Sequence, residues 1–336
     1  MTRKLRVGVV GVGRFGRHHA RIYSELDEVE LVGVADPDAE RAADVARRAD
    51  TAVFTDYHDL IDKVDAVSVA VPTRSHRSVS CDFLSRGVSV LVEKPMASSL
   101  AEALEMQAVA EKSGAALQVG LVYRFSPFMR AIREMDIEPK FIEVHRLSPF
   151  SFRSLDVGVV LDMMIHDIDL VLQLVRGRVE KIDAVAFAIV GATEDICSAR
   201  MAFDDGCVAN LTASRVALKT MRKVRLFSSD SYISMDFDKD NGLLIKRSPE
   251  FSLDNIDIEK MKELSIDELK EVMLDDFFTV REMKIDEVEP LRAELESFVA
   301  CVRDGRTPLV PAADGIRSME TAERILEAVK AHKWYR

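Results

Sequence analysis

The run Gly11-Val12-Gly13-Arg14-Phe15-Gly16 constrains the fold of this chain more than any other feature. It follows an apolar stretch, Leu5–Val10, and opens a segment with helical spacing, Arg14–Ser24. A G-x-G-x-x-G run between a strand and a helix is typical of a dinucleotide-binding βαβ unit: the first glycine makes the tight turn, the second admits a pyrophosphate, and the third lets the helix pack closely. A glycine-rich turn without a ligand is the alternative. In the binding interpretation, Arg14 and Phe15 belong to the cofactor-binding loop.

Two kinds of pattern divide the chain. Short apolar runs alternate with helical stretches over residues 1–122, which predicts an NAD-binding Rossmann domain with a doubly wound parallel sheet. From residue 123 to 336, strand-like runs follow one another across short turns, with a hairpin signal at Asp204-Asp205-Gly206. These predict a C-terminal α+β domain with a large, mostly antiparallel open sheet, for substrate binding and oligomerisation. We expect the terminal helices, within 290–331, to pack back on the first domain. The acidic segment 250–276 is predicted to be mostly helical, with a capping box at Ser265 and Glu268, and has no assigned role.

Composition excludes several classes of function. Lys and Arg number 46 against 57 Asp and Glu, a net charge of −11, so the chain lacks the global field that attracts nucleic acid or anionic membrane. No apolar run reaches the roughly 18–20 residues of a membrane helix. The four cysteines form no C-x-x-C pair, which argues against a zinc ribbon or a redox dithiol. We therefore expect a cytoplasmic protein without a metal site, membrane insertion or a nucleic-acid partner.

Asp36 indicates which dinucleotide the first domain binds. It ends the second apolar run, about 20 residues beyond the glycines, where a carboxylate accepts the adenosine ribose hydroxyls and repels a 2′-phosphate. The sequence therefore favours NAD over NADP. Arg41 lies nearby and would either stack on adenine or hold the extra phosphate of NADP. A helix N-cap is the structural alternative for Asp36.

Two further patterns carry acid–base chemistry. Glu93-Lys94-Pro95 follows the apolar run Ser89–Val92, at the carboxyl end of a strand where ligands of parallel sheets bind. Asp162 and His166 stand four residues apart on a predicted helix, Val159–Val175, so they share one face. A solvated helix pair is the alternative for that spacing.

These features together resemble one family. Over nearly its whole length the chain is similar to the glucose–fructose oxidoreductase/inositol dehydrogenase (Gfo/Idh/MocA) family. The matching residues are the glycine run, Asp36, Val71-Pro72-Thr73 with His76, Glu93-Lys94-Pro95, Asp162-x-x-x-His166 and Glu289-Pro290-Leu291. The resemblance implies an NAD-dependent oxidoreductase acting on CH–OH groups. It also implies a homodimer or homotetramer assembled through the C-terminal sheet.

The same resemblance gives the catalytic residues their roles. His166 is the expected base, because its intrinsic pKa lies near neutrality. Lys94 would donate to the reacting oxygen, and Asp162, or less favourably Asp169, would orient the imidazole. We expect the cofactor site to include Pro72, Thr73, His76, Glu93 and Lys94 besides the glycine run, Asp36 and Arg41. A turn histidine is the equal alternative for His76.

The substrate is predicted from the start of the second domain. Arg124 and Arg153 would suit an anionic substrate, because guanidinium groups bind phosphate in forks; ion pairing within the protein is the alternative. The expected substrate site comprises Tyr123, Arg124, Arg153, Lys94, Asp162 and His166. The Arg124-Phe-Ser-Pro stretch is similar to a nucleotide-sugar subgroup of the family, which implies oxidation of UDP-N-acetylglucosamine at C3 to a 3-keto sugar for lipid A and cell-envelope synthesis. An inositol or free-monosaccharide dehydrogenase is the second hypothesis, and a non-catalytic NAD-bound regulator the third.

Overall fold

Two compact units make up the chain. The computed structural model describes residues 3–332 except 136, 152–156, 249–250, 253–255, 266, 269–276 and 284–287. Unit 1 comprises the chain up to residue 130 together with 168–170 and 288–324, and unit 2 comprises 131–167, 171–287 and the chain from 325 onward. These units are not continuous stretches of sequence, so the boundary after residue 122 stays a prediction. None of the described helices combines the length and apolar character needed to cross a membrane.

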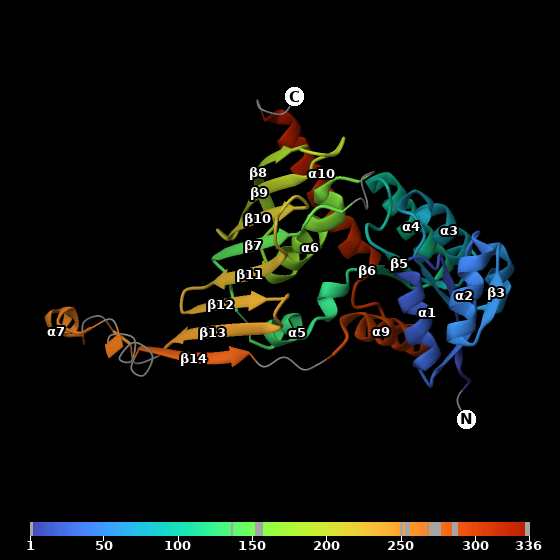
Figure 1. The fold of residues 1–336 in the computed structure, drawn as a ribbon, viewed down its shortest axis with the longest axis horizontal. Helices are drawn as coiled ribbons and strands as arrows, with labels where there is room; N and C mark the ends of the chain where they lie inside the picture. The colour runs from blue at the N-terminus through green and yellow to red at the C-terminus, as the bar shows by residue number, and fades with distance from the viewer. Residues whose placement is uncertain are drawn as a thin grey trace. The chain divides into compact units, whose positions relative to one another are not determined.

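Unit 1 contains a six-stranded parallel sheet, sheet A, in the order β3-β2-β1-β4-β5-β6 (Figure 1). This order confirms the predicted doubly wound fold, in which ligands bind beyond the carboxyl ends of the strands where the strand order reverses, here between β1 and β4. The strands are β1 (Leu5–Val10), β2 (Val29–Ala35), β3 (Ala52–Phe54), β4 (Ala66–Val69), β5 (Ser89–Glu93) and β6 (Leu117–Gly120).

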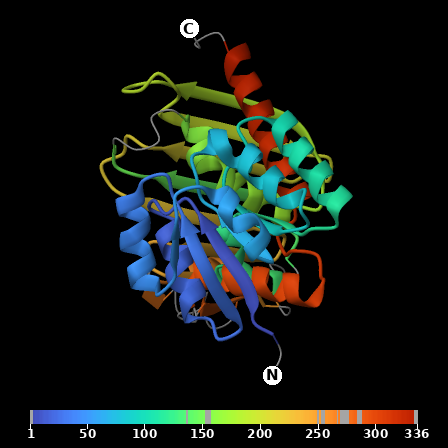
Figure 2. The ribbon, with the colours of Figure 1, turned by 90° about the vertical axis from the view of Figure 1, so that its right-hand side faces the viewer.

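Amphipathic helices cover this sheet. α1 packs beside α2, and α3 beside α4 (Figure 2). Their bounds are α1 (Gly16–Glu25), α2 (Ala39–Ala49), α3 (His76–Leu84) and α4 (Leu100–Ser113). α9 (Pro290–Asp304) packs against α1 and places Leu295 and Phe298 in the same core cluster as Val7 and Tyr23. Burial of these large apolar side chains holds the first βαβ unit in place, because apolar surface removed from water supplies the main favourable term.

Unit 2 contains an eight-stranded mixed sheet, sheet B, in the order β14-β13-β12-β11-β7-β10-β9-β8. Only β7 and β10 pair in parallel; the other neighbours are antiparallel. The strands are β7 (Phe141–Leu147), β8 (Val179–Phe187), β9 (Ile196–Phe203), β10 (Val208–Ser214), β11 (Met221–Phe227), β12 (Ser231–Asp236), β13 (Asn241–Arg247) and β14 (Phe278–Met283). The predicted hairpin turn joins β9 to β10, with Gly206 at φ +85°. The mostly antiparallel open sheet is thereby confirmed.

Three strands and one helical irregularity differ from the expectation. β3, β13 and β14 were not predicted, because β3 has only three residues and the other two carry charged or polar residues at several positions. The predicted helix Val159–Val175 begins instead as a π-helical turn, Val160–Met164, and continues as α6 (Ile165–Leu174). Glu194 binds the start of that turn: its backbone carbonyl accepts from the Val159 N–H at 3.0 Å and its carboxylate from the Val160 N–H at 3.2 Å.

The remaining helices are α5 (Pro127–Glu134), α7 (Ile258–Lys262) and α10 (Ala312–Ala331). α7 is the part of the acidic segment that the described residues show as a complete helix, and much of the rest lies outside them. The capping box is confirmed, since the Ser265 N–H donates to the Glu268 carboxylate at 2.9 Å and the Glu268 N–H donates to the Ser265 hydroxyl at 3.3 Å.

Candidate cofactor and catalytic site

The glycine loop has the geometry that a bound pyrophosphate requires. Gly11 adopts φ +83°, and a Cβ there would lie 2.7 Å from the Ala70 carbonyl oxygen. A Cβ at Gly16 would lie 1.8 Å from the Gly11 carbonyl oxygen, so only glycine lets α1 begin against the loop. Gly13 differs, because a Cβ there would meet no protein atom within 4 Å. Its missing side chain leaves room for a ligand beside the first turn of α1, where backbone N–H groups favour an anion.

Asp36 joins this loop to the end of β2. Its carboxylate is buried and accepts from the Val12 N–H at 2.9 Å and from the Asp38 N–H at 3.0 Å. Arg41 approaches the same carboxylate at 3.4 Å and also pairs with Asp38 at 2.8 Å. The helix N-cap role falls instead to Asp38, which accepts from the Arg41 N–H at the start of α2. Asp36 therefore holds the loop while lying where the fold places a ribose.

A cavity of about 640 Å³ opens at this edge of sheet A. It is bordered by Gly11, Gly13, Asp36, Arg41 and Pro72, all of them in the expected cofactor set. The loop after β3 also contributes Thr55, Asp56 and Tyr57, which the sequence analysis missed because it did not recognise β3. The size suits part of a dinucleotide. The residues present thus fit NAD; the contacts of its adenosine with Asp36 and of its diphosphate with the glycine loop stay predictions.

Replacing Asp36 with alanine tests this arrangement. We expect NAD to bind about 10- to 100-fold more weakly, the effect of losing hydrogen bonds to a charged acceptor, and the preference for NAD over NADP to narrow because the carboxylate no longer repels a 2′-phosphate. Fluorescence titration with both dinucleotides measures the two effects. Asp38→Ala is the matched control, since Asp38 also contacts Arg41 but lies outside the cavity lining. Unchanged NAD affinity in Asp36→Ala would remove Asp36 from the cofactor site.

Lys94 follows β5 at the same edge of sheet A as the glycine loop. His76 is buried and contacts the residue after Lys94: its Nδ1 lies 2.9 Å from the Pro95 carbonyl oxygen. Its Nε2 lies 2.9 Å from the Val71 carbonyl oxygen. Burial lowers the pKa of His76, and the carbonyl contacts only partly offset it. A neutral ring has one N–H and donates to one carbonyl at a time. His76 therefore links the loop after β4 to the turn that carries Lys94, and its contact with the cofactor stays a prediction.

Glu93 faces the interior of unit 1. One carboxylate oxygen lies 3.0 Å from Nε2 of His19, a fully buried residue of α1, and the other accepts from the Lys94 N–H at 3.3 Å. Burial raises the pKa of Glu93, but the hydrogen bond and charge of His19 outweigh it, so the pKa is lowered overall. Glu93 thus binds the backbone N–H of Lys94 from the interior of unit 1. The sequence predicted Glu93 only as a cofactor-binding residue and did not indicate this structural contact.

Glu294, on α9, is a buried acid that the sequence analysis missed. Its side chain has no exposed surface, and neither carboxyl oxygen has a hydrogen-bond partner among the described residues. Burial and then the charge of Glu93 raise its pKa well above the ordinary value. Burial without a hydrogen-bond partner among the described residues therefore favours the neutral form of the Glu294 carboxyl group. A signal was present in the sequence, since Glu294 lies on the same helical face as Leu291 and Phe298, an apolar stripe.

Glu294→Gln is expected to stabilise the protein at neutral and alkaline pH. The raised pKa means that the folded state keeps a proton which the unfolded state releases above 4.5, the ordinary value. This contribution to stability is complete below that pH and falls as pH rises toward the folded-state pKa. Glutamine keeps the shape and removes the titration. Thermal unfolding at several pH values should show the variant gaining on the wild type as pH rises. Parallel curves would show that Glu294 is ionised in the fold.

Asp162 and His166 lie in unit 2 at the irregular helix. Asp162 is half-buried on the π-helical turn, and His166 is buried near the start of α6. π-helical turns within helices occur frequently at functional sites, because they re-aim side chains. The neighbouring Asp167 does not compete with Asp162 to orient the His166 imidazole, since Arg146 on β7 binds the Asp167 carboxylate at 2.6 Å. The pairing of Asp162 with His166 stays a prediction.

Of the two arginines expected to bind substrate, only Arg124 lies among the described residues. Arg124 is buried in unit 1, where its guanidinium forks onto Asp169 at 2.6 and 2.8 Å and reaches Asp314 at 2.9 Å. These contacts argue for the ion-pair alternative and also engage Asp169, the less favoured partner of His166. Arg153 lies outside the described residues. Tyr123 is half-buried on a 3₁₀ turn after β6.

Comparisons with known proteins agree with this geometry. The family model described as "Oxidoreductase family, NAD-binding Rossmann fold" matches residues 5–121, and "GFO/IDH/MocA C-terminal domain" matches 138–233. A UDP-N-acetylglucosamine 3-dehydrogenase from Acidithiobacillus ferrooxidans is 39% identical over 234 residues, 69% of this chain and 74% of that protein. Its solved structure aligns with a TM-score of 0.86 at 32% identity, over 98% of both chains. A scyllo-inositol 2-dehydrogenase (NAD(+)) from Bacillus subtilis is 25% identical over 95% of this chain and 92% of its own.

The parallel sheet, the glycine loop and the cavity beside Asp36 define an NAD-dependent oxidoreductase with a Rossmann domain. The chain belongs to the GFO/IDH/MocA family, and the two relatives named above are dehydrogenases of a nucleotide sugar and of scyllo-inositol.

Proposed function

We propose that this oxidoreductase oxidises C3 of a nucleotide sugar, UDP-N-acetylglucosamine, to its 3-keto form. One observation carries the proposal: the structural similarity to a UDP-N-acetylglucosamine 3-dehydrogenase extends over 98% of both chains at 32% identity. A 3-keto amino sugar is the kind of product that a transaminase consumes, which agrees with a step in lipid A or cell-envelope synthesis. Oxidation of inositol is the second candidate, favoured by the 25% identity to a scyllo-inositol dehydrogenase over 95% of this chain.

In the proposed reaction, three side chains have a chemical role. Oxidation of a secondary alcohol removes a hydride from carbon and a proton from the hydroxyl, and bound NAD supplies the hydride acceptor. His166 takes the hydroxyl proton, since an imidazole has an intrinsic pKa near neutrality. Asp162 orients that imidazole and stabilises its charged form. Lys94 donates to the reacting oxygen and stabilises the negative charge that develops there.

A further part of the proposal is self-association through sheet B. Alternate residues of β7 are only half-buried in the chain by itself, among them Phe141, Glu143 and His145. A second copy of this chain could pack against such a broad sheet face and bury these residues. Light scattering should then give a mass two or four times 37.6 kDa; a monomer would refute this part and leave the reaction untouched.

Substrate panels test the reaction. The purified protein with NAD is offered UDP-N-acetylglucosamine, free N-acetylglucosamine and myo-inositol in parallel, and NADH absorbance is followed. We expect NADH from the nucleotide sugar, and reduction of the trapped product with borodeuteride should place deuterium at C3 by NMR. Turnover of inositol without turnover of the nucleotide sugar would reverse the choice. Deuterium at another carbon would retain the substrate and correct the position.

A further inference from the structure

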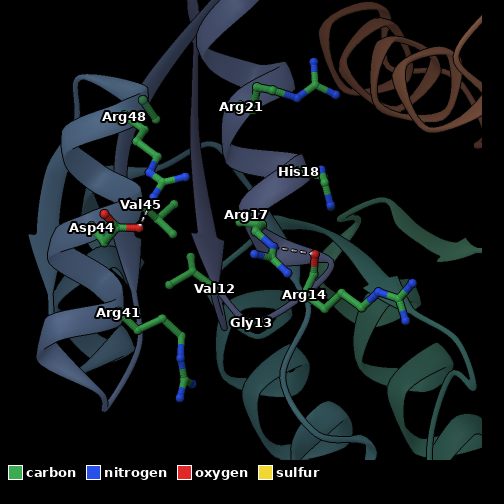
Figure 3. Close-up of a pocket in the computed structure, with 11 residues that line it drawn as sticks. Val12, Gly13, Arg14, Arg17, His18, Arg21, Arg41, Asp44, Val45 and Arg48 are labelled. Atoms are coloured by element: carbon green, nitrogen blue, oxygen red, sulfur yellow. Dashed lines mark hydrogen bonds and ion pairs between the residues drawn. The ribbon is translucent and has the colours of Figure 1, made fainter. Parts of the chain in front are cut away.

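A second cavity in unit 1 lies between α1 and α2, beside the glycine loop (Figure 3). It has a volume of about 780 Å³ and meets the cavity at Asp36 along Gly13 and Arg41, which line both. Arg48 extends from α2 into the space between these helices, and the Arg17 guanidinium lies at the first turn of α1, directed toward the Arg14 carbonyl oxygen. Five arginines line this groove against a single carboxylate, that of Asp44. The family's dinucleotide fingerprint explains the Gly13 edge of the groove but not the arginines farther along both helices.

The positive charge of the groove is only partly neutralised. Arg48 pairs with Asp44 at 2.9 Å, and Arg21 shares Glu25 and Glu289 on the outer side. Arg14 and Arg17 make no ion pair with any described residue; the Nε of Arg17 donates to the Arg14 carbonyl oxygen at 3.3 Å. The positive charge also acts on His18, whose pKa is lowered by partial burial and then by the charges of Arg17 and Arg21. In a chain of net charge −11, this local excess of cations is the opposite of the average surface.

The shape and chemistry of the groove select a class of ligand. Guanidinium groups bind phosphate oxygens in forks, and several guanidinium groups along one groove suit a ligand with more than one phosphate. The buried side chains of Val12, Val45 and Ala49 give the groove an apolar floor. A volume of this size lies within the range of small-molecule sites. A single chloride or carboxylate would engage only a fraction of these donors.

We propose that the groove between α1 and α2 binds a diphosphate- or triphosphate-bearing anion at a site separate from that of NAD. Arg17 and Arg48 hold the phosphates from facing helices. Asp44 limits the affinity, because it lies among the cations and repels the ligand. Occupancy of the groove does not depend on the identity of the sugar substrate.

Calorimetric titration with inorganic pyrophosphate, in the presence of saturating NAD, tests the site. We expect binding to the NAD-loaded protein, weakened about 10- to 100-fold in Arg48→Ala and in Arg17→Ala, the effect of one charge-assisted hydrogen bond. Arg47→Ala is the matched control: Arg47 also pairs with Asp44, at 3.0 Å, but does not line the groove. Asp44→Asn should bind about fivefold more tightly, the effect of one charge contact in a high-dielectric setting.

Three results would overturn the proposal. Pyrophosphate that binds only when NAD is absent would assign the anion to the cofactor's own diphosphate position. Equal weakening in Arg47→Ala and Arg48→Ala would reduce the effect to general surface charge. The absence of any binding to the wild-type protein would leave the arginines as solvated side chains. Thermal unfolding of each variant, measured alongside, separates a lost ligand contact from a lost fold.

Discussion

Lys94→Met will lower kcat by about 10²- to 10⁴-fold, the usual contribution of a positioned proton-transfer or charge-stabilising group. Methionine keeps the length of the side chain and removes the ammonium. Lys94 acts on the reacting oxygen in the proposed chemistry, so kcat and kcat/KM should fall together while the affinity for NAD stays the same. Initial rates with the nucleotide sugar and fluorescence titration with NAD measure these quantities separately.

Lys112→Met provides the control for Lys94→Met, because Lys112 is an exposed residue in the last turn of α4. Its rate should equal that of the wild type. If Lys94→Met instead raised KM and left kcat unchanged, the lysine would contribute only to substrate binding. His166→Asn, measured beside it, should lose turnover by a similar factor, and full activity in that variant would exclude His166 as the base.

Arg124→Met is expected to cost about 3–5 kcal/mol in the free energy of unfolding, the usual penalty for breaking a buried ion pair from one side. Its side chain is 5% exposed and that of Asp169 is 4% exposed, with the two charges 2.6 Å apart. Burial raises the pKa of Asp169, and Arg124 offsets that only in part. Methionine would leave Asp169 and Asp314 without their shared cation inside the protein. Urea unfolding followed by circular dichroism measures the loss.

Arg86→Met is the comparison for Arg124→Met, since Arg86 is 67% exposed and lies 4.0 Å from Asp62. Such a surface pair contributes at most about 1 kcal/mol. The two interpretations of Arg124 predict different readouts. A stabilising role changes the free energy of unfolding and leaves KM nearly constant when assayed well below the unfolding transition. An increased KM with unchanged stability would restore Arg124 to the substrate site.

Local patterns were sufficient to predict that the residues expected to bind the nucleotide lie at one edge of sheet A. The glycine run, Asp36 and Lys94 each follow an apolar run, and parallel strands bring their carboxyl ends to one edge of a sheet. The strand order β3-β2-β1-β4-β5-β6 places all three there. The apolar stretch Leu5–Val10 agrees with the bounds of β1 in the structure.

Long-range contacts were beyond those patterns. Arg124 lies 45 residues from Asp169 and 190 from Asp314, and no periodicity indicates which carboxylate a buried arginine will meet. The sequence suggested that Arg124 binds an anionic substrate, whereas in the structure its guanidinium group pairs with two carboxylates inside unit 1. His19 is likewise fully buried against Glu93, 74 residues away.

The sequence by itself determined the class of this protein: a dinucleotide-binding fold, with Asp36 after β2 and Lys94 after β5 at one edge of its sheet. These follow from residues close together in the chain, whose geometry the backbone fixes. Tertiary structure alone decided which charged side chains pair inside the fold, that burial raises the pKa of Glu294, and that α1 and α2 surround a groove lined by arginines. Those outcomes depend on burial and on partners distant in sequence, and both exist only once the chain has packed.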